Sequence, residues 1–168
     1  AARIIGPACR SLRRVLILEP PADAAALQIR SEYLKAFRPR FRPVRYGPHM
    51  RGPLEPSVAR TFRGRSYSER LLASDILAYR LYGGTAKQLG HYWSLVRPYG
   101  PLQAQLDLAI APQWGNTLNN VATARIPAGT TIYEGAAASQ TTGVGHLPGG
   151  GSQIYIRYVD PSWFIPGS

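Results

Sequence analysis

A run of three glycines followed closely by a glutamine is the part of the sequence most suited to binding chemistry. Gly149, Gly150 and Gly151 let the backbone adopt positive φ angles, so a ligand can approach its N–H groups. Gln153 opens an alternating apolar segment at residues 154–159, which predicts a strand. A glutamine amide donates and accepts hydrogen bonds, which suits a carboxamide or a sugar hydroxyl. The same pattern also fits a plain hairpin loop with Gln153 facing water.

Arg80 is the second residue whose surroundings suggest chemistry. It is the only charge in the apolar segment 76–82, which predicts a strand that ends at the Gly-Gly pair 83–84. A buried arginine is rare unless it is paired, so Arg80 either extends to the surface or faces a polar site, where it can reach an anion held at the turn. Tyr92 and Trp93 are candidate pocket walls, although aromatic side chains more often belong to the core.

The elements that must position these residues form an expected domain over residues 75–168. Residues 101–110 predict a short helix, because proline suits the first turn and the apolar residues recur at helical spacing. Residues 121–126 and 131–134 predict two strands of one hairpin, and residues 161–165 are expected to close the sheet. The sequence therefore predicts an α+β fold, a compact and mostly antiparallel β domain with short helices.

Residues 1–74 differ in composition and predict a basic, partly helical arm and linker. Residues 24–37 show the apolar spacing of a helix. Residues 38–56 repeat Pro, Gly and Arg, which cannot continue a helix or a central strand. Residues 61–72 are ambiguous, with Ser68 as a possible helix cap.

The net charge of +11 is distributed unevenly along the chain. Residues 1–70 carry 15 Arg and Lys and five acidic residues, whereas residues 71–168 carry five and four, which leaves net charges of +10 and +1. So basic an arm favours an acidic partner, whether a protein, a nucleic acid or a membrane surface. Specific nucleic-acid recognition is the weaker option, because prolines interrupt the arginines and few aromatic residues accompany them.

Several kinds of site lack the residues they need. Cys9 is the only cysteine, which excludes an internal disulfide and a thiolate metal cluster. His49, His91 and His146 are far apart in sequence and none is paired with a carboxylate at ligand spacing, so no metal or other cofactor is expected. No apolar run approaches membrane-spanning length. The motifs of a Ser-His-Asp or Cys-His hydrolase, a P-loop and a Rossmann fold are also absent.

The scarcity of carboxylates narrows the chemistry of the expected domain. Residues 75–168 contain four acidic residues, which is few for a two-carboxylate glycosidase. The nicotinamide–ribose bond of NAD needs no strong general acid, because its leaving group is a cationic pyridinium that departs neutral. An enzyme for this bond must bind pyrophosphate, hold the ribose and stabilise an oxocarbenium-like transition state. Arg80, the glycine loop, Gln153 and an aromatic wall can supply these functions.

Five segments resemble, in order, the tuberculosis necrotizing toxin family of NAD(P) glycohydrolases, found at the C-termini of secreted bacterial polymorphic toxins and as fungal surface NADases. The resemblance covers roughly residues 76–165 and leaves out the basic arm. It implies hydrolysis of NAD or NADP, as substrate and not as cofactor, to nicotinamide and ADP-ribose or its phosphate. The segments are Arg80-Leu81-Tyr82-Gly83, Gly90-His91-Tyr92-Trp93-Ser94 with Pro98, the short helix, residues 121–126, and Pro148-Gly149-Gly150-Gly151-Ser152-Gln153-Ile154.

The resemblance also implies roles for individual residues. Arg80 matches the family's arginine before a glycine-rich turn, Tyr92 falls at its substrate-side aromatic position, and Gln153 matches its functional glutamine. These three are therefore the expected catalytic residues. Trp93 and the glycines 149–151 are expected to bind substrate.

The sequence departs from the family pattern at two places. The family usually has an arginine in the short helix, where this chain offers Gln105 among other polar residues. It often has a histidine in the following strand, where this chain offers Arg125. Gln105 and Arg125 are thus expected substitutes in substrate binding, and His146 and Asn120 are further candidates.

The resemblance implies a secreted toxin domain that acts in the cytoplasm of a target cell and is neutralised by an acidic cognate immunity protein. An ADP-ribosyltransferase also uses NAD, but Glu134 stands alone where that class has a Glu-x-Glu motif. A basic ribonuclease with His91 or His146 as acid or base is a further alternative. A binding module without enzymatic activity remains the simplest alternative.

Overall fold

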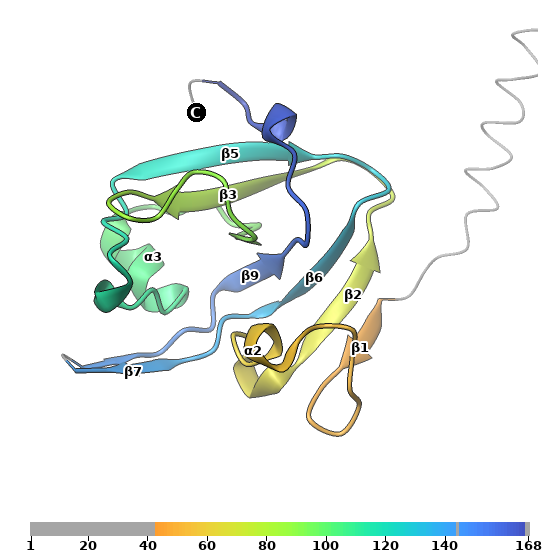
Figure 1. Cartoon of the computed structure of the whole chain (residues 1–168), viewed down its shortest axis with the longest axis horizontal. Helices are drawn as coiled ribbons and strands as arrows, with labels where there is room; N and C mark the ends of the chain where they lie inside the picture. The colour runs from red at the N-terminus through yellow and green to blue at the C-terminus, as the bar shows by residue number, and fades with distance from the viewer. Residues whose placement is uncertain (1–42, 144, 167–168) are drawn as a thin grey trace, which may run out of the picture. The chain divides into compact units, whose positions relative to one another are not determined.

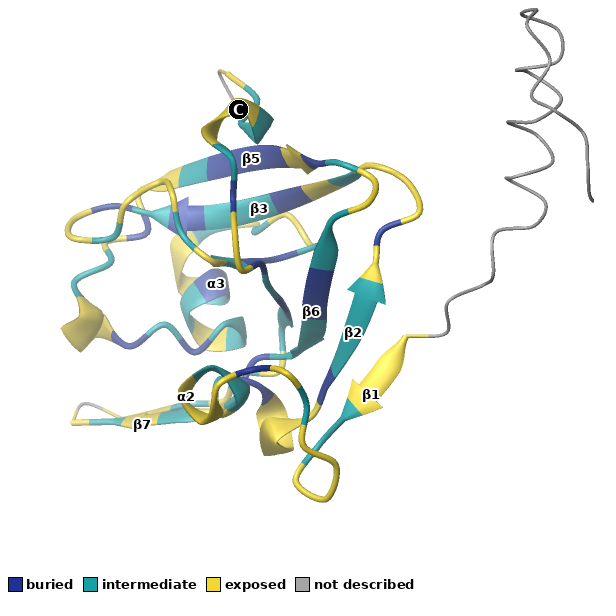
Figure 2. Cartoon of the chain, turned by 45° about the vertical axis from the view of Figure 1, so that its right-hand side comes forward, coloured by how far each residue is buried: buried dark blue, intermediate teal, exposed yellow. Residues whose placement is uncertain are grey.

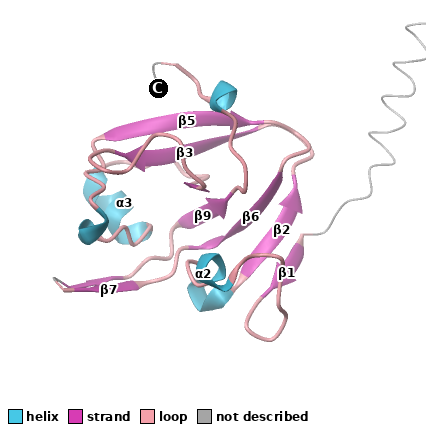
Figure 3. Cartoon of the chain, in the orientation of Figure 1, coloured by secondary structure: helices cyan, strands magenta, loops and turns pink. Residues whose placement is uncertain are grey.

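The computed structural model describes residues 43–143 and 145–166, and strands dominate this part of the chain (Figure 1, Figure 3). Its helices are short, and the longest of them, α3, has seven residues. The elements, in chain order, are β1 (Val44–Tyr46), α2 (Pro56–Ala59), η2 (Arg63–Arg65), β2 (Tyr67–Leu71), β3 (Ile76–Tyr82), β4 (Tyr92–Trp93), α3 (Pro101–Asp107), η3 (Pro112–Trp114), β5 (Asn120–Ile126), β6 (Thr131–Ala136), β7 (Gln140–Thr142), β8 (Gly145–Leu147), β9 (Ser152–Tyr155) and η4 (Pro161–Trp163).

The largest sheet has five strands in the order β1-β2-β6-β9-β4, all antiparallel. Its central strand, β6, is buried on both sides: Ile132 is 0% exposed and its neighbour Tyr133 is 4% exposed. Because successive strand residues point to opposite faces, both faces of the sheet must be covered.

The first face packs against the two-stranded sheet formed by β3 and β5. Ala122, Ala124 and Ile126 alternate along β5 and are at most 1% exposed, as are Ile132 and Ile154 opposite them. Figure 2 shows the buried stretches of β5 and β6 in this interior. Complete burial of an isoleucine contributes about 1.5–3 kcal/mol, so this layer supplies much of the stability.

The second face is covered by the segment that surrounds α2. Leu54, Phe62, Tyr67 and Tyr133 form a separate buried cluster there. Gly135 of β6 makes room for this cover, because a Cβ atom at that position would lie 2.9 Å from Cδ1 of Phe62. Thr61, the residue before Phe62, is thereby held next to Gln153 of β9.

Two smaller elements complete the described part of the fold. α3 packs through Ala104 against Leu81 and Leu118, at the ends of the β3–β5 sheet. β7 and β8 form a hairpin that projects from the body of the domain (Figure 1). None of the helices in the described residues is long and apolar enough to cross a membrane.

The predicted fold class is confirmed, but the predicted hairpin of residues 121–126 and 131–134 is wrong. β5 pairs with β3, whereas β6 pairs with β2 and β9 in the other sheet. The turn between β5 and β6 bonds to Leu72, the residue that follows β2, which accepts from Gly129 N at 2.8 Å and donates to Thr130 O at 2.9 Å. It carries the chain from one sheet to the other.

The expected boundary between arm and domain also differs from the structure. β1, α2 and β2, which lie before residue 75, belong to the domain, since β2 pairs with β6 from Ser68 to Leu71. Ser68 therefore lies within a strand and caps no helix. The helix expected at residues 24–37 lies outside the described residues.

Candidate functional site

A pocket of about 380 Å³ brings the three expected catalytic residues together. Its size falls within the roughly 300–1,000 Å³ typical of small-molecule sites. The residues come from four strands, η3 and the connections between the elements, including the turn that follows α3. They are Thr61, Tyr79, Arg80, Leu81, Ala86, Tyr92, Trp93, Leu108, Ala109, Ile110, Trp114, Asn116, Ala138, Gln140 and Gln153.

A contact between two strands of different sheets places Arg80 beside Tyr92. Tyr79 of β3 and Ser94 exchange backbone hydrogen bonds of 2.8 and 2.7 Å. Arg80 follows Tyr79 and Tyr92 lies two residues before Ser94, so Arg80 Nη1 donates to the Tyr92 carbonyl at 2.8 Å. The site therefore depends on the packing of the two sheets against each other.

Gln153 is held in a defined orientation and is 8% exposed. Its Nε2 donates to the backbone carbonyl of Thr61 at 3.2 Å and to Thr61 Oγ1 at 2.9 Å. A carbonyl oxygen can only accept, so the amide nitrogen must face Thr61. Oε1 then has no hydrogen-bond donor among the described residues and is available to accept one from a ligand.

Thr61 joins Gln153 to Tyr92. Its own hydroxyl donates to Val58 O at 2.8 Å, which leaves the lone pairs of Oγ1 for the Gln153 amide. Burial raises the pKa of the Tyr92 hydroxyl, while its hydrogen bond to the Thr61 side chain acts in the opposite direction. Tyr92 is therefore neutral at physiological pH, as a hydrogen-bonding group or ring wall requires.

Arg80 is a partly buried cation that pairs with no carboxylate in the part of the chain that the structure describes. Its Nε donates to Lys87 O at 3.2 Å and its Nη1 to Tyr92 O at 2.8 Å. The only ion pair among the described residues joins Arg70 to Glu134. Burial lowers the pKa of Arg80, although an arginine remains charged at neutral pH. A bound anion would compensate for the lost hydration, and the guanidinium retains N–H donors for it.

Another part of the pocket lining is apolar. It consists of the end of α3 and the following turn, with Leu108, Ala109, Ile110 and Trp114. Ala109 adopts a left-handed φ of 49°, which turns the chain after α3 and brings Ile110 and Trp114 to the pocket. The pocket thus has a polar side for hydrogen bonds and an apolar side for a flat ring.

Trp93 contributes to the pocket only in part, because its ring belongs to the core. It is 2% exposed, stacks on Phe164 at 5.7 Å and donates its Nε1–H to Gly90 O at 2.7 Å. Trp93 also lines the pocket, so its expected role in binding substrate stays a prediction beside its role in the core.

The glycine loop does not line the pocket. The N–H groups of Gly149 and Gly151 donate to the carbonyls of Leu106 and Asp107 at the end of α3, at 3.0 and 2.8 Å. The N–H of Gly150 donates to Ala137 O at 2.9 Å. All three N–H groups are used within the protein, so the loop fastens α3 to the sheet and does not cradle a ligand.

The remaining sequence candidates also lie outside the pocket. Arg125 is exposed on β5, opposite Leu77 in register. Gln105 is half-buried on α3, Asn120 begins β5, and His146 is exposed on the β7–β8 hairpin. His91 is exposed, with Nδ1 3.0 Å from Ile156 O.

Sequence reasoning missed several residues that line the pocket. Thr61 lies 92 positions before Gln153, and no local pattern connects the two. Asn116 binds Leu81 O at 3.2 Å and Leu118 N at 3.0 Å, so it shapes the loop beside the pocket. Trp114 had one signal in the sequence, which was an aromatic residue in a loop rich in polar and small residues.

No carboxylate, imidazole or thiol lines the pocket among the described residues. In the same part of the chain, no group of three or more His, Cys, Asp or Glu residues could hold a metal ion. Comparison with known proteins gives no family model, no curated protein and no solved structure that matches this chain. The chemistry of the pocket itself is therefore the guide to function.

Proposed function

We propose that the domain hydrolyses the nicotinamide–ribose bond of NAD or NADP. The observation that carries this proposal is the convergence of Arg80, Tyr92 and Gln153 on one pocket that no acidic side chain of the described residues lines. A cationic leaving group that departs neutral does not require a general acid, so a pocket with these side chains suits cleavage of the nicotinamide–ribose bond. The order of motifs that resemble the tuberculosis necrotizing toxin family supports the same reaction.

In this proposal Gln153 acts on the ribose. Its amide nitrogen is engaged by Thr61, so its oxygen accepts a hydrogen bond from a ribose hydroxyl or from the attacking water. Fixing that oxygen before the substrate arrives lowers the entropic cost of reaching the reactive geometry. Tyr92 forms the wall beside it and excludes water from the bond that breaks.

Arg80 binds the pyrophosphate in the same proposal. The partly buried guanidinium has no carboxylate nearby among the described residues, which makes a phosphate oxygen a favourable partner. This contact also holds the substrate while charge develops on the ribose.

The reaction balances without a further reactant. The bond between ribose C1′ and the nicotinamide nitrogen breaks, and its electron pair stays on nicotinamide. A water oxygen bonds to C1′ and loses one proton to solvent. NAD⁺ and water thus give nicotinamide, ADP-ribose and a proton.

The two enzymatic alternatives have less support from the pocket. A transferase of the usual type needs a glutamate at the ribose, and Glu134 instead pairs with Arg70 at 2.8 Å. A histidine-dependent nuclease needs imidazole at the site, and neither His91 nor His146 lines the pocket.

A secreted toxin domain acting in the cytoplasm of a target cell, with an acidic protein inhibitor, is part of the same proposal. Exposed arginines at positions 51, 60 and 65 support an acidic partner, because no carboxylate pairs with them among the described residues.

The test is incubation of the full chain with NAD, NADP and RNA in parallel, with nicotinamide and ADP-ribose measured by chromatography. Gln153→Ala should lower nicotinamide release on the order of 10²-fold, as for loss of one positioned group at a reacting centre. Gln105→Ala, on a glutamine outside the pocket, should leave it unchanged. Intact NAD and NADP together with degraded RNA would overturn the proposal and favour a nuclease.

A further inference from the structure

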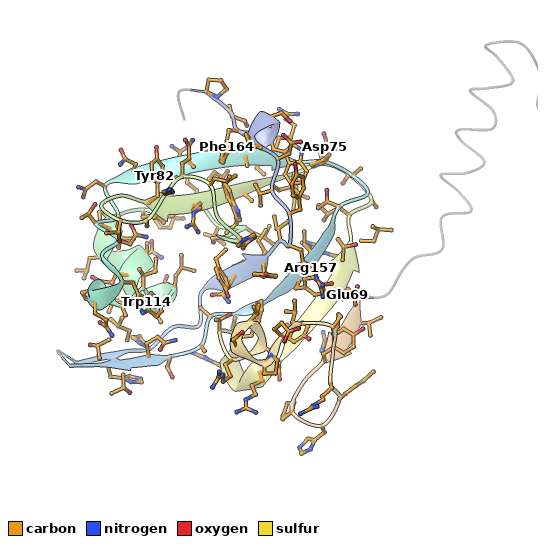
Figure 4. The ribbon with its side chains drawn as sticks, in the orientation of Figure 1. Glu69, Asp75, Tyr82, Trp114, Arg157 and Phe164 are labelled. Carbon is orange, nitrogen blue, oxygen red and sulfur yellow. The ribbon has the colours of Figure 1, made fainter. Side chains whose placement is uncertain are left out.

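Trp114 is a large apolar side chain that is 54% exposed at the mouth of the pocket. It belongs to η3, and Figure 4 shows it beside α3. Burying an indole is strongly favourable, so a half-exposed ring at a pocket mouth points to a partner that arrives with the ligand.

The other two tryptophans show how unusual this environment is within the described residues. Trp93 stacks on Phe164, and Trp163 packs edge-on against Tyr158 with ring centroids 6.4 Å apart. Trp93 also donates its indole N–H to a carbonyl. Among the described residues no aromatic ring contacts Trp114 and no acceptor takes its N–H.

The backbone that carries Trp114 is fixed although the ring is exposed. Thr85 Oγ1 donates to Trp114 O at 2.9 Å, and Thr85 N donates to Gly115 O at 3.0 Å. Gly115 adopts a φ of 70°, and a Cβ there would lie 2.5 Å from Thr85 Oγ1. A ring on a rigid turn can bind a flat ligand with little loss of entropy.

We propose that Trp114 forms a base-binding subsite and stacks on the adenine ring of the dinucleotide. This inference rests on the proposed function, which places the nicotinamide ribose at Gln153. The exposed fractions of Gln153 and Trp114 then indicate which way the dinucleotide runs through the pocket. Gln153, at 8% exposure, marks the deep end where the nicotinamide ribose lies, and Trp114 marks the open end. The adenylate half, which lies beyond the pyrophosphate, then reaches the tryptophan.

The subsite makes Trp114 a determinant of dinucleotide over mononucleotide specificity. Stacking of a base on an aromatic ring is worth roughly tenfold or more in affinity, the equivalent of about 1.4 kcal/mol. Trp114→Ala should therefore raise KM for NAD roughly tenfold with kcat nearly unchanged. Hydrolysis of nicotinamide mononucleotide, which has no adenine, should not change.

Kinetics on two substrates test the subsite. Trp114→Phe should restore most of the affinity for NAD, because a phenyl ring also stacks. Leu102→Ala is the control, an apolar residue 69% exposed on α3 that does not line the pocket. Equal losses on NAD and on the mononucleotide would overturn the adenine assignment.

A binding measurement separates this inference from the proposed reaction. AMP and ADP-ribose should quench tryptophan fluorescence of the wild-type chain, and Trp114→Phe should remove the quenching. Quenching in a chain that does not hydrolyse NAD would support the subsite and refute the glycohydrolase. Hydrolysis of NAD without any Trp114-dependent quenching would refute the subsite alone.

Discussion

Gly90 offers a way to move Arg80 without changing it. A Cβ atom at this position would lie 2.5 Å from both Cζ and Nη2 of Arg80. Gly90 does not have a positive φ, so alanine can adopt its backbone conformation. The group that would be displaced is the end of a flexible side chain, and the backbone can therefore remain in place.

The size of the displacement follows from contact distances. Non-bonded carbon atoms prefer about 3.5–4.0 Å, so the guanidinium in Gly90→Ala must shift by about 1 Å. The shift weakens its hydrogen bonds to Lys87 O and Tyr92 O, now 3.2 and 2.8 Å long. A misplacement of about 1 Å at a substrate-positioning group can cost on the order of 10²-fold in rate. We expect a loss of that order in kcat/KM for NAD.

The assay is nicotinamide release at several NAD concentrations, with the free energy of unfolding measured in urea on the same preparations. Gly100→Ala is the matched control, because no atom lies within 4 Å of its added Cβ and its φ of −178° suits any residue. Arg80→Lys is a second test variant, since it retains the positive charge but lacks the planar guanidinium group. Wild-type kcat/KM in Gly90→Ala, or an equal loss in Gly100→Ala, would refute the role assigned to the position of Arg80.

Three further predictions concern the surroundings of the pocket. Thr61→Val removes one acceptor from the Gln153 amide and should lower kcat roughly fivefold, as for one hydrogen bond of about 1 kcal/mol, in steady-state assays. Gly151→Ala places a Cβ 2.8 Å from Asp107 O and should lower the free energy of unfolding by about 1–3 kcal/mol, whereas Gly143→Ala, with nothing within 4 Å, should not. Burial raises the pKa of Tyr92, so its neutral form stabilises the fold below about pH 10 and this contribution is lost as the pH rises through the raised pKa. Urea titrations from about pH 8 to about pH 11 should show a smaller alkaline loss of stability in Tyr92→Phe than in wild type, and an equal loss would contradict the assignment.

Local patterns in the sequence were sufficient for several elements of the fold. The apolar run before Gly83-Gly84 predicted β3, and the strand after the glycine run is β9, with Gln153 at its second residue. Proline at the first turn predicted α3, whose helix ends at Asp107. These features depend on backbone preferences within a few residues, so they can be read along the chain.

Pairing of strands could not be read in the same way. β5 and β6 follow each other closely, as in a hairpin, yet β5 pairs with β3, and β6 pairs with β2 and β9 in the other sheet. β2 lies in a basic segment whose charge predicted an arm. In the structure, Tyr67 of β2 packs with Phe62 and Tyr133 in a buried cluster. Which surfaces become buried depends on partners far away in sequence.

For the candidate site, the sequence by itself determined which chemical groups are available, namely an arginine in an apolar strand, a glutamine after glycines, and few carboxylates. The tertiary structure decided which of them meet. The contact of Tyr79 with Ser94 brings Arg80 to the Tyr92 carbonyl, and the bonds from the Gln153 amide to Thr61 orient Gln153. The N–H groups of the glycine loop, which the sequence left available to a ligand, bond instead to the end of α3 and to Ala137 O. Hydrogen bonds must be satisfied wherever the backbone is buried, and the partner that satisfies them is set by the packing of the whole domain.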